Sequence, residues 1–163
     1  MNKPKNHRQR SARARGLRTL QHQTLPPATR YAIDTEVWFR SFVAESEDGR
    51  GHDPGWPTKD QVHDEAIGWF LDRHAQRPFE HYPARRAQDE DLTFWVDSKL
   101  MQRARRMATR DGVKVARLID AALSAYARAH VPEGLTGFRR RVQVAATRLY
   151  LSKHRRRARS RKR

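Results

Sequence analysis

The side chains in this sequence that are best suited to chemistry are cationic, and they gather at the two ends of the chain. Residues 1–30 carry eight Lys and Arg and no acid, and residues 134–163 carry twelve and no acid. The centre is close to neutral, although the whole chain of 163 residues has a formal net charge of +17. Blocks of like charge repel one another and attract polyanions. This distribution therefore favours phosphate binding at both ends.

No set of residues matches a catalytic or metal-binding motif. His63 stands beside Asp64 and Glu65, but no second His follows at the spacing of a metalloprotease helix, so we expect a solvated polar surface there. The glycines within residues 49–55 lack the Lys-Ser or Lys-Thr that completes a phosphate-binding loop. The chain has no cysteine, which excludes disulfides and zinc–thiolate sites. We expect neither an enzyme nor a bound metal or cofactor.

One segment changes from the pattern of a strand to the pattern of a helix. Leu92, Phe94 and Val96 alternate with Thr93 and Trp95, which is typical of a half-buried strand. A strand of this length leaves half of its backbone groups unpaired, and the segment offers no second strand. A second copy of the chain is the simplest partner. The pattern therefore predicts an intermolecular antiparallel β-ribbon and an obligate homodimer.

Two helices are expected directly after this strand. Asp97 is a good N-cap, and apolar residues recur at helical spacing from Leu100 to Ala108. Asp111-Gly112 predicts a break, because glycine readily adopts the left-handed conformation that ends a helix. A second apolar face then begins at Val115 and should end near Pro132.

This strand, helix, turn and helix resemble a known family. The matching run is L-T-F-W-V-D-S-K-L-M-Q-R-A-R-R-M-A-T-R-D-G-V-K-V-A-R-L-I-D-A-A-L-S-A-Y. It is similar to the ribbon-helix-helix repressors of the Arc, MetJ and CopG group, over about residues 91–128. The resemblance implies a dimer whose two-stranded ribbon enters the major groove of DNA.

The resemblance also implies residue roles. The side chains that read base edges would be Asp91, Thr93 and Trp95. The first turn of the second helix would hold a phosphate through Lys114, Val115 and Ala116. The core of the dimer would consist of the apolar residues Leu92, Phe94, Val96, Leu100, Leu118, Ile119 and Leu123.

We expect five segments in a mainly α protein. They are a basic disordered arm (1–30), a small segment of two helices (31–74), a linker (75–90), the ribbon-helix-helix domain (91–130) and a basic C-terminal extension (131–163). The pattern from Phe138 to Leu149 is compatible with a helix in the extension. The expected nonspecific phosphate contacts are Arg139, Arg140, Arg141, Arg155, Arg156 and Arg157.

The sequence favours a homodimer that binds double-stranded DNA sequence-specifically, as a transcriptional repressor or as a plasmid copy-control or partition factor. Two alternatives stay open: an accessory protein of a conjugal relaxation complex, and a nonspecific DNA- or RNA-packaging protein driven by its basic arms. Aromatic residues within 31–74, such as Trp38 and Trp69, would form either a small core or a surface for a protein partner. We expect a cytoplasmic protein associated with the nucleoid or a plasmid, and no membrane contact.

Overall fold

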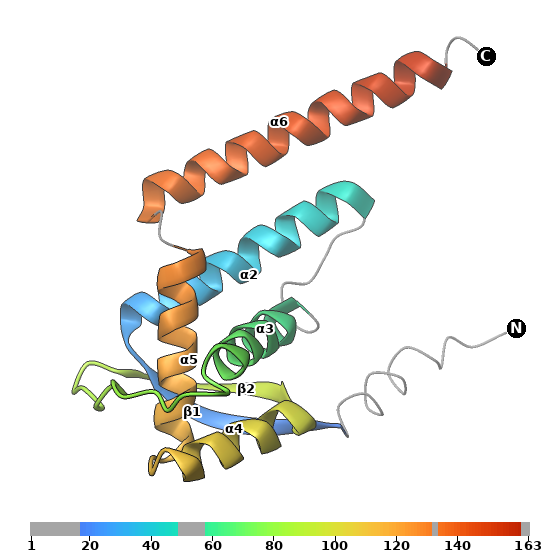
Figure 1. Ribbon diagram of the computed structural model, residues 1–163. Coiled ribbons are helices and arrows are strands. Elements are labelled where there is room, and N and C mark those ends of the chain that lie inside the picture. Colours follow the sequence, from blue (N-terminus) through green and yellow to red (C-terminus); the bar gives the residue numbers. More distant parts are fainter. Residues whose placement is uncertain (1–16, 49–57, 132–133, 161–163) are drawn as a thin grey trace, which may run out of the picture.

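A two-stranded antiparallel sheet joins two parts of the chain that are far apart in sequence. β1 (Arg18–Leu25) pairs with β2 (Glu90–Asp97), and Arg18 lies opposite Asp97. The computed structural model describes residues 17–48, 58–131 and 134–160. Within these residues the fold is mainly helical, with five helices and this two-stranded sheet (Figure 1).

The ribbon is formed within one chain. The sequence predicted that β2 would pair with a second copy of itself, and this is wrong for the strand partner, because β1 occupies that place. The physical reason for expecting a second copy was an unpaired strand. Within the chain, β1 now pairs with that strand. The homodimer stays a prediction, but an unpaired strand no longer supports it.

β1 lies in a segment that we expected to be a disordered arm. Its inward-facing side chains include Gln21 and Gln23, which are buried, so the strand lacks hydrophobic alternation. Their amides are hydrogen-bonded: Gln21 Nε2 donates to Gln23 Oε1 at 3.2 Å, and Gln23 Nε2 donates to the carbonyl of Ala116 at 2.9 Å. The expectation is wrong from Arg18 onward, and residues 1–16 lie outside the described part of the chain.

The helices after β2 follow the sequence prediction. α4 (Ser98–Arg110) begins at the N-cap Asp97, whose Oδ1 accepts from the backbone N–H of Lys99 at 2.9 Å. α4 ends before Gly112, which has a φ of +67°. This is the left-handed region in which a side chain would be strained. α5 (Val115–His130) then runs back across the sheet (Figure 1).

The helices after β1 belong to the same core. α2 (Pro27–Asp48) begins inside the predicted arm, and α3 (Thr58–Arg73) follows it. Residues 31–74 are therefore not a separate small core. One hydrophobic cluster draws buried side chains from both strands and four helices, including Ile33, Phe70, Phe94, Met101 and Leu118.

His63 is part of this core. The sequence predicted solvated surface around it, but its side chain is 1% exposed and its ring stacks on Phe94 with centroids 4.0 Å apart. Its Nδ1 lies 2.7 Å from the carbonyl of Lys59, which gives the ring a hydrogen-bond partner. Burial lowers the pKa of His63 to about 4, so the ring is neutral at physiological pH.

The fold contains two halves, each of one strand followed by two helices: β1, α2 and α3 form the first half, and β2, α4 and α5 form the second. The two halves are arranged alike. α3 and α5 pack on each other at the centre, α5 lies against β1, and α3 lies against β2. α2 packs on α3 and α5, just as α4 packs on α5 and α3. Trp69 and Tyr126, each eleven residues beyond the first residue of its helix, contact each other with ring centroids 6.0 Å apart. The halves are therefore related by an approximate two-fold axis.

The basic C-terminal extension is helical over most of its length. α6 (Gly134–Ser160) packs on α2 at the end of the molecule far from the ribbon (Figure 1). Trp38 of α2 contacts Phe138 of α6 with ring centroids 5.4 Å apart and stacks on Phe42 at 5.5 Å. Part of the aromatic surface that we considered for a protein partner is thus covered by the chain itself.

The predicted linker has no helix or strand between residues 75 and 89, but it is attached to the core. Phe79 packs on Phe70 with ring centroids 5.1 Å apart. The hydroxyl of Tyr82 donates to Asp111 Oδ2 at 2.6 Å. The linker is therefore held against the turn between α4 and α5.

Candidate nucleic-acid interface

The outward-facing side of the sheet forms a polar surface that both strands supply. We call it the ribbon face. The predicted base-reading residues Asp91 and Thr93 are exposed on it, and Trp95 is half-buried. Side chains of a β-strand alternate between its two sides. By this alternation and the strand register, the ribbon face consists of Leu20, His22, Thr24, Asp91, Thr93 and Trp95.

Direct pairs across the ribbon join these residues. His22 lies opposite Thr93, and His22 Nδ1 is 3.2 Å from Thr93 Oγ1. Leu20 lies opposite Trp95, and Thr24 lies opposite Asp91. The face therefore presents hydrogen-bonding groups at its centre, a carboxylate on one side and apolar surface on the other.

The predicted core residues lie on the inward side as expected, although the core belongs to one chain. Phe94 and Val96 are buried, and so are the three α5 residues Leu118, Ile119 and Leu123. Leu92 and Leu100 are partly buried against the same cluster. The burial of alternate residues in β2 holds Thr93 and Trp95 on the opposite side.

The predicted phosphate-binding turn lies next to the ribbon face. Lys114 is the exposed N-cap of α5, and its side chain makes no capping hydrogen bond. Val115 and Ala116 are half-buried. A groove of about 590 Å³ beside them is lined by Thr24 of the ribbon face and by the cationic side chains of Arg85, Lys114 and Arg117. A second hollow, lined by His22, Thr24, Asp91, Thr93 and Ala116 among others, continues from this turn onto the ribbon.

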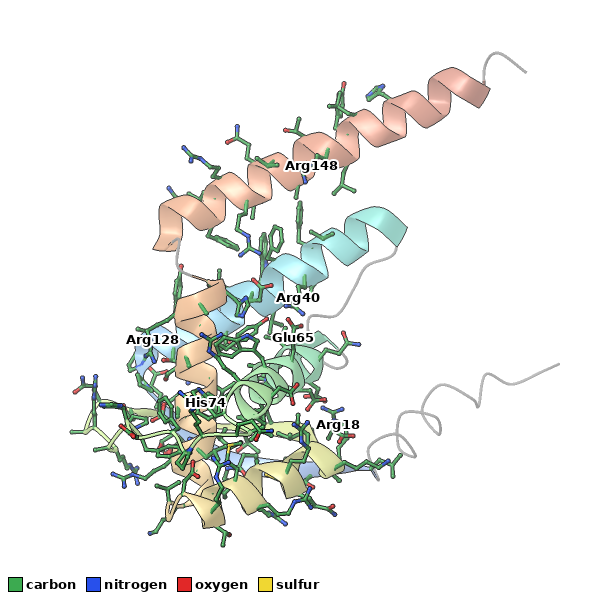
Figure 2. All side chains as sticks on the ribbon, viewed as in Figure 1. Arg18, Arg40, Glu65, His74, Arg128 and Arg148 are labelled. Atoms are coloured by element: carbon green, nitrogen blue, oxygen red, sulfur yellow. The ribbon has the colours of Figure 1, made fainter. Side chains whose placement is uncertain are left out.

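The start of α3 stands in the equivalent place beside β2, but its charges are paired. Arg18 Nη2 donates to Asp64 Oδ2 at 2.7 Å and to the carbonyl of Trp95 at 3.1 Å (Figure 2). Arg18 Nε lies 3.6 Å from Asp60 Oδ2. Asp64 Oδ1 also accepts from the backbone N–H of Asp97 at 2.9 Å. Burial raises the pKa of Asp60, which the positive charge of Arg18 opposes.

The arginines that we expected to make nonspecific phosphate contacts divide into three groups. Arg139 and Arg140 are exposed on α6, as is Arg148 (Figure 2). Arg141 instead packs against α2: its Nη1 lies 3.1 Å from Glu36 Oε2, and its guanidinium lies over the Phe39 ring at 4.2 Å. Arg155, Arg156 and Arg157 fall within α6, but their side chains lie outside the described part of the structure.

A cluster of charged groups ties α2, α3 and α5 together behind the interface. Arg40 and Glu65 face each other between α2 and α3 (Figure 2), with Arg40 Nη1 2.6 Å from Glu65 Oε2. The hydroxyl of Tyr126 donates to Glu65 Oε1 at 2.7 Å. Burial and this hydrogen bond raise the pKa of Tyr126 to about 12. These contacts hold the helices that support the ribbon, and they lie away from it.

Sequence reasoning missed the contribution of β1 to the ribbon face. Leu20, His22 and Thr24 lie in a run without Gly, Pro, Asp or Glu from Leu17 to Leu25, and this uninterrupted run was the available signal. Arg85, on the rim of the groove, was missed because it stands in the predicted linker. Both become visible only when β1 and residues 75–89 are placed against β2 and α5.

No protein-family model matches this chain, and neither do curated proteins or solved structures. Among the helices described, none is long and apolar enough to cross a bilayer. The described residues also include no group of three or more His, Asp or Glu side chains placed to hold a metal ion.

Proposed function

We propose that the protein binds double-stranded DNA, with the ribbon face lying in the major groove. The observation that carries the proposal is an outward-facing six-residue surface on a two-stranded antiparallel ribbon, bordered by a cationic groove. The major groove is wide enough to admit a two-stranded ribbon. The resemblance of residues 91–128 to ribbon-helix-helix repressors supports the same mode of binding.

The side chains of the ribbon face fit the recognition of bases. Thr93 and His22 can donate or accept hydrogen bonds at base edges. The carboxylate of Asp91 accepts from the amino group of cytosine, and the apolar surfaces of Trp95 and Leu20 suit the methyl group of thymine. We therefore propose sequence-specific binding, with the roles of repressor, plasmid copy-control or partition factor, or conjugal accessory protein all compatible with it.

Phosphates next to the ribbon would be held by the first turn of α5. The side chain of the N-cap Lys114 makes no capping hydrogen bond with the backbone N–H groups of this turn, which include those of Val115 and Ala116, and it adds a positive charge. These contacts carry no sequence information, but they position the ribbon on the duplex.

One chain supplies both strands of the ribbon, so we propose that one chain is a complete DNA-binding unit. The homodimer predicted from the sequence is not needed to complete it. This unit would act in the cytoplasm, on nucleoid or plasmid DNA.

Selection from a pool of random-sequence duplexes tests the proposal. The full-length protein is expected to enrich a defined sequence, because base contacts from the ribbon favour one site over others. Thr93→Ala should relax the preference at one base pair by about 1–3 kcal/mol. The matched control is Thr147→Ala on the exposed side of α6, which should keep the full preference. Trp95→Ala should relax the preference at another base pair, and full discrimination by both ribbon variants would show that the ribbon does not read DNA.

A second candidate is nonspecific binding of nucleic acid through α6, which the exposed Arg139, Arg140 and Arg148 favour. Replacing these three residues with Gln would then remove most of the affinity, and the random pool would yield no enriched sequence. If the ribbon is the reader, the triple variant should keep its site preference and lose affinity uniformly across sequences.

A further inference from the structure

The approximate two-fold axis of the fold runs through the centre of the ribbon. Pro26 and Asp97 are the residues that directly precede α2 and α4. Counting back four residues from each reaches His22 and Thr93, and these two residues lie opposite each other in the sheet. In a symmetric dimer, a central pair of this kind would consist of two copies of the same residue.

The positions that the axis relates carry unlike side chains. The same alignment makes Leu20 equivalent to Asp91, and Thr24 equivalent to Trp95. An apolar side chain thus stands where the other half has a carboxylate, and a small hydroxyl stands where the other half has an indole. None of the three equivalent pairs presents the same groups to DNA, so the two ends of the ribbon face fit different base pairs.

The charged side chains beside the two ends of the ribbon also differ. Beside Thr24 stand three exposed cations, Arg85, Lys114 and Arg117, and two carboxylates. The carboxylate of Asp120 is 5% exposed and accepts a hydrogen bond from Ser124, and that of Asp91 lies opposite Thr24 in the sheet. Beside Trp95, Arg18 pairs with the two carboxylates of Asp60 and Asp64, and the charge of Lys59 also acts on Asp60. A DNA backbone would therefore be attracted more strongly to the end of the ribbon at Thr24 than to the end at Trp95.

We infer that one chain binds a non-palindromic duplex site in a single orientation, with the phosphate backbone at one end held beside Arg85, Lys114 and Arg117. This inference rests on the proposed function and adds to it the symmetry of the target. A symmetric dimer of one strand type selects a palindrome, because its two halves present the same groups. Here the covalent link between unlike halves removes that restriction.

Directed cleavage of the enriched duplex tests the orientation. The chain has no cysteine, so single cysteines can carry an iron chelate that cuts nearby DNA through hydroxyl radicals. Ala28→Cys and Lys99→Cys form a matched pair, because both positions are exposed and each is the second residue of its helix, α2 or α4. Neither belongs to the ribbon face or to the cationic groove.

Each labelled variant should cut on one side of the site only, and the two variants should cut on opposite sides. One chain per duplex should be found by sedimentation. Cutting on both sides by each variant, or a palindromic enriched sequence bound by two chains, would overturn the inference while leaving the proposed function in place. Failure to enrich any sequence and to protect any duplex would overturn both.

Charge variants give a second, independent readout. Lys114→Gln and Arg117→Gln should each reduce the slope of log affinity against log salt by about 0.9, the value for one lost phosphate contact. Lys59→Gln beside β2 is the matched control and should leave the slope unchanged. Equal losses on both sides would contradict the single orientation.

Discussion

A disulfide between the two strands is the sharpest test of the fold, because the natural chain has no cysteine. The variant His22→Cys/Thr93→Cys places two thiols at directly opposed positions of β1 and β2. Opposed residues of an antiparallel pair have Cα atoms about 4.5–5.5 Å apart, within the range that a disulfide spans. The bond should therefore form within one chain on mild oxidation.

The expected gain in stability follows from the length of the loop that the disulfide closes. The two positions are about 70 residues apart, and the loss of chain entropy in the unfolded state would stabilise the folded state by up to about 4 kcal/mol. The two replaced side chains are exposed, and their contact at 3.2 Å contributes little in water. We therefore expect a clear net stabilisation of the oxidised form.

The assay combines two measurements on the same sample. Non-reducing electrophoresis should show an oxidised monomer, and urea unfolding with and without reductant should give the difference in stability. Thr93→Cys alone serves as the control and should stay monomeric. A covalent dimer as the main oxidised product of the double variant would refute pairing of the strands within one chain.

Three further changes test the core and the caps. Phe94→Ala, at a side chain 2% exposed and stacked on His63, should lower the free energy of unfolding by about 3–5 kcal/mol without changing the sedimentation coefficient of the folded protein. Asp97→Ala removes the cap that accepts from Lys99 and Leu100 and should cost about 1 kcal/mol in chemical unfolding, whereas Asp97→Asn should cost less. The pKa of His63 is lowered to about 4 in the folded protein, so between pH 6.5 and 4 the unfolded chain binds a proton that the folded chain excludes. Stability should therefore fall by up to about 3 kcal/mol as the pH drops through this window, and a His63→Gln variant with the same slope would contradict this origin.

The second strand–helix–helix half could be predicted because its signals are local. The alternation around Phe94, the N-cap at Asp97 and the left-handed Gly112 each act within a few residues, and the structure confirms all three. The side of β2 that carries Thr93 also follows from alternation, since neighbouring side chains of a strand point to opposite sides.

The first half could not be predicted in the same way. β1 buries Gln21 and Gln23 where an ordinary strand would bury apolar residues, and the cost of burying an amide is removed only by its hydrogen bonds. One of those bonds reaches Ala116, more than ninety residues away in sequence. Without α5 in place, this segment has the composition of a polar arm.

The sequence by itself determined the positions of β2, α4 and α5, the cationic character of both ends and the absence of cysteine. The tertiary structure decided that β2 pairs with β1, that the core belongs to one chain, and that Leu20, His22 and Thr24 share a face with Asp91, Thr93 and Trp95. The physical reason is range: caps, turns and periodicity are interactions between near neighbours, whereas a strand of alternating pattern accepts any partner with a matching edge. The two edges are brought together by tertiary packing: α3 and α5 pack on each other and lie against β2 and β1, and α4 lies against both strands.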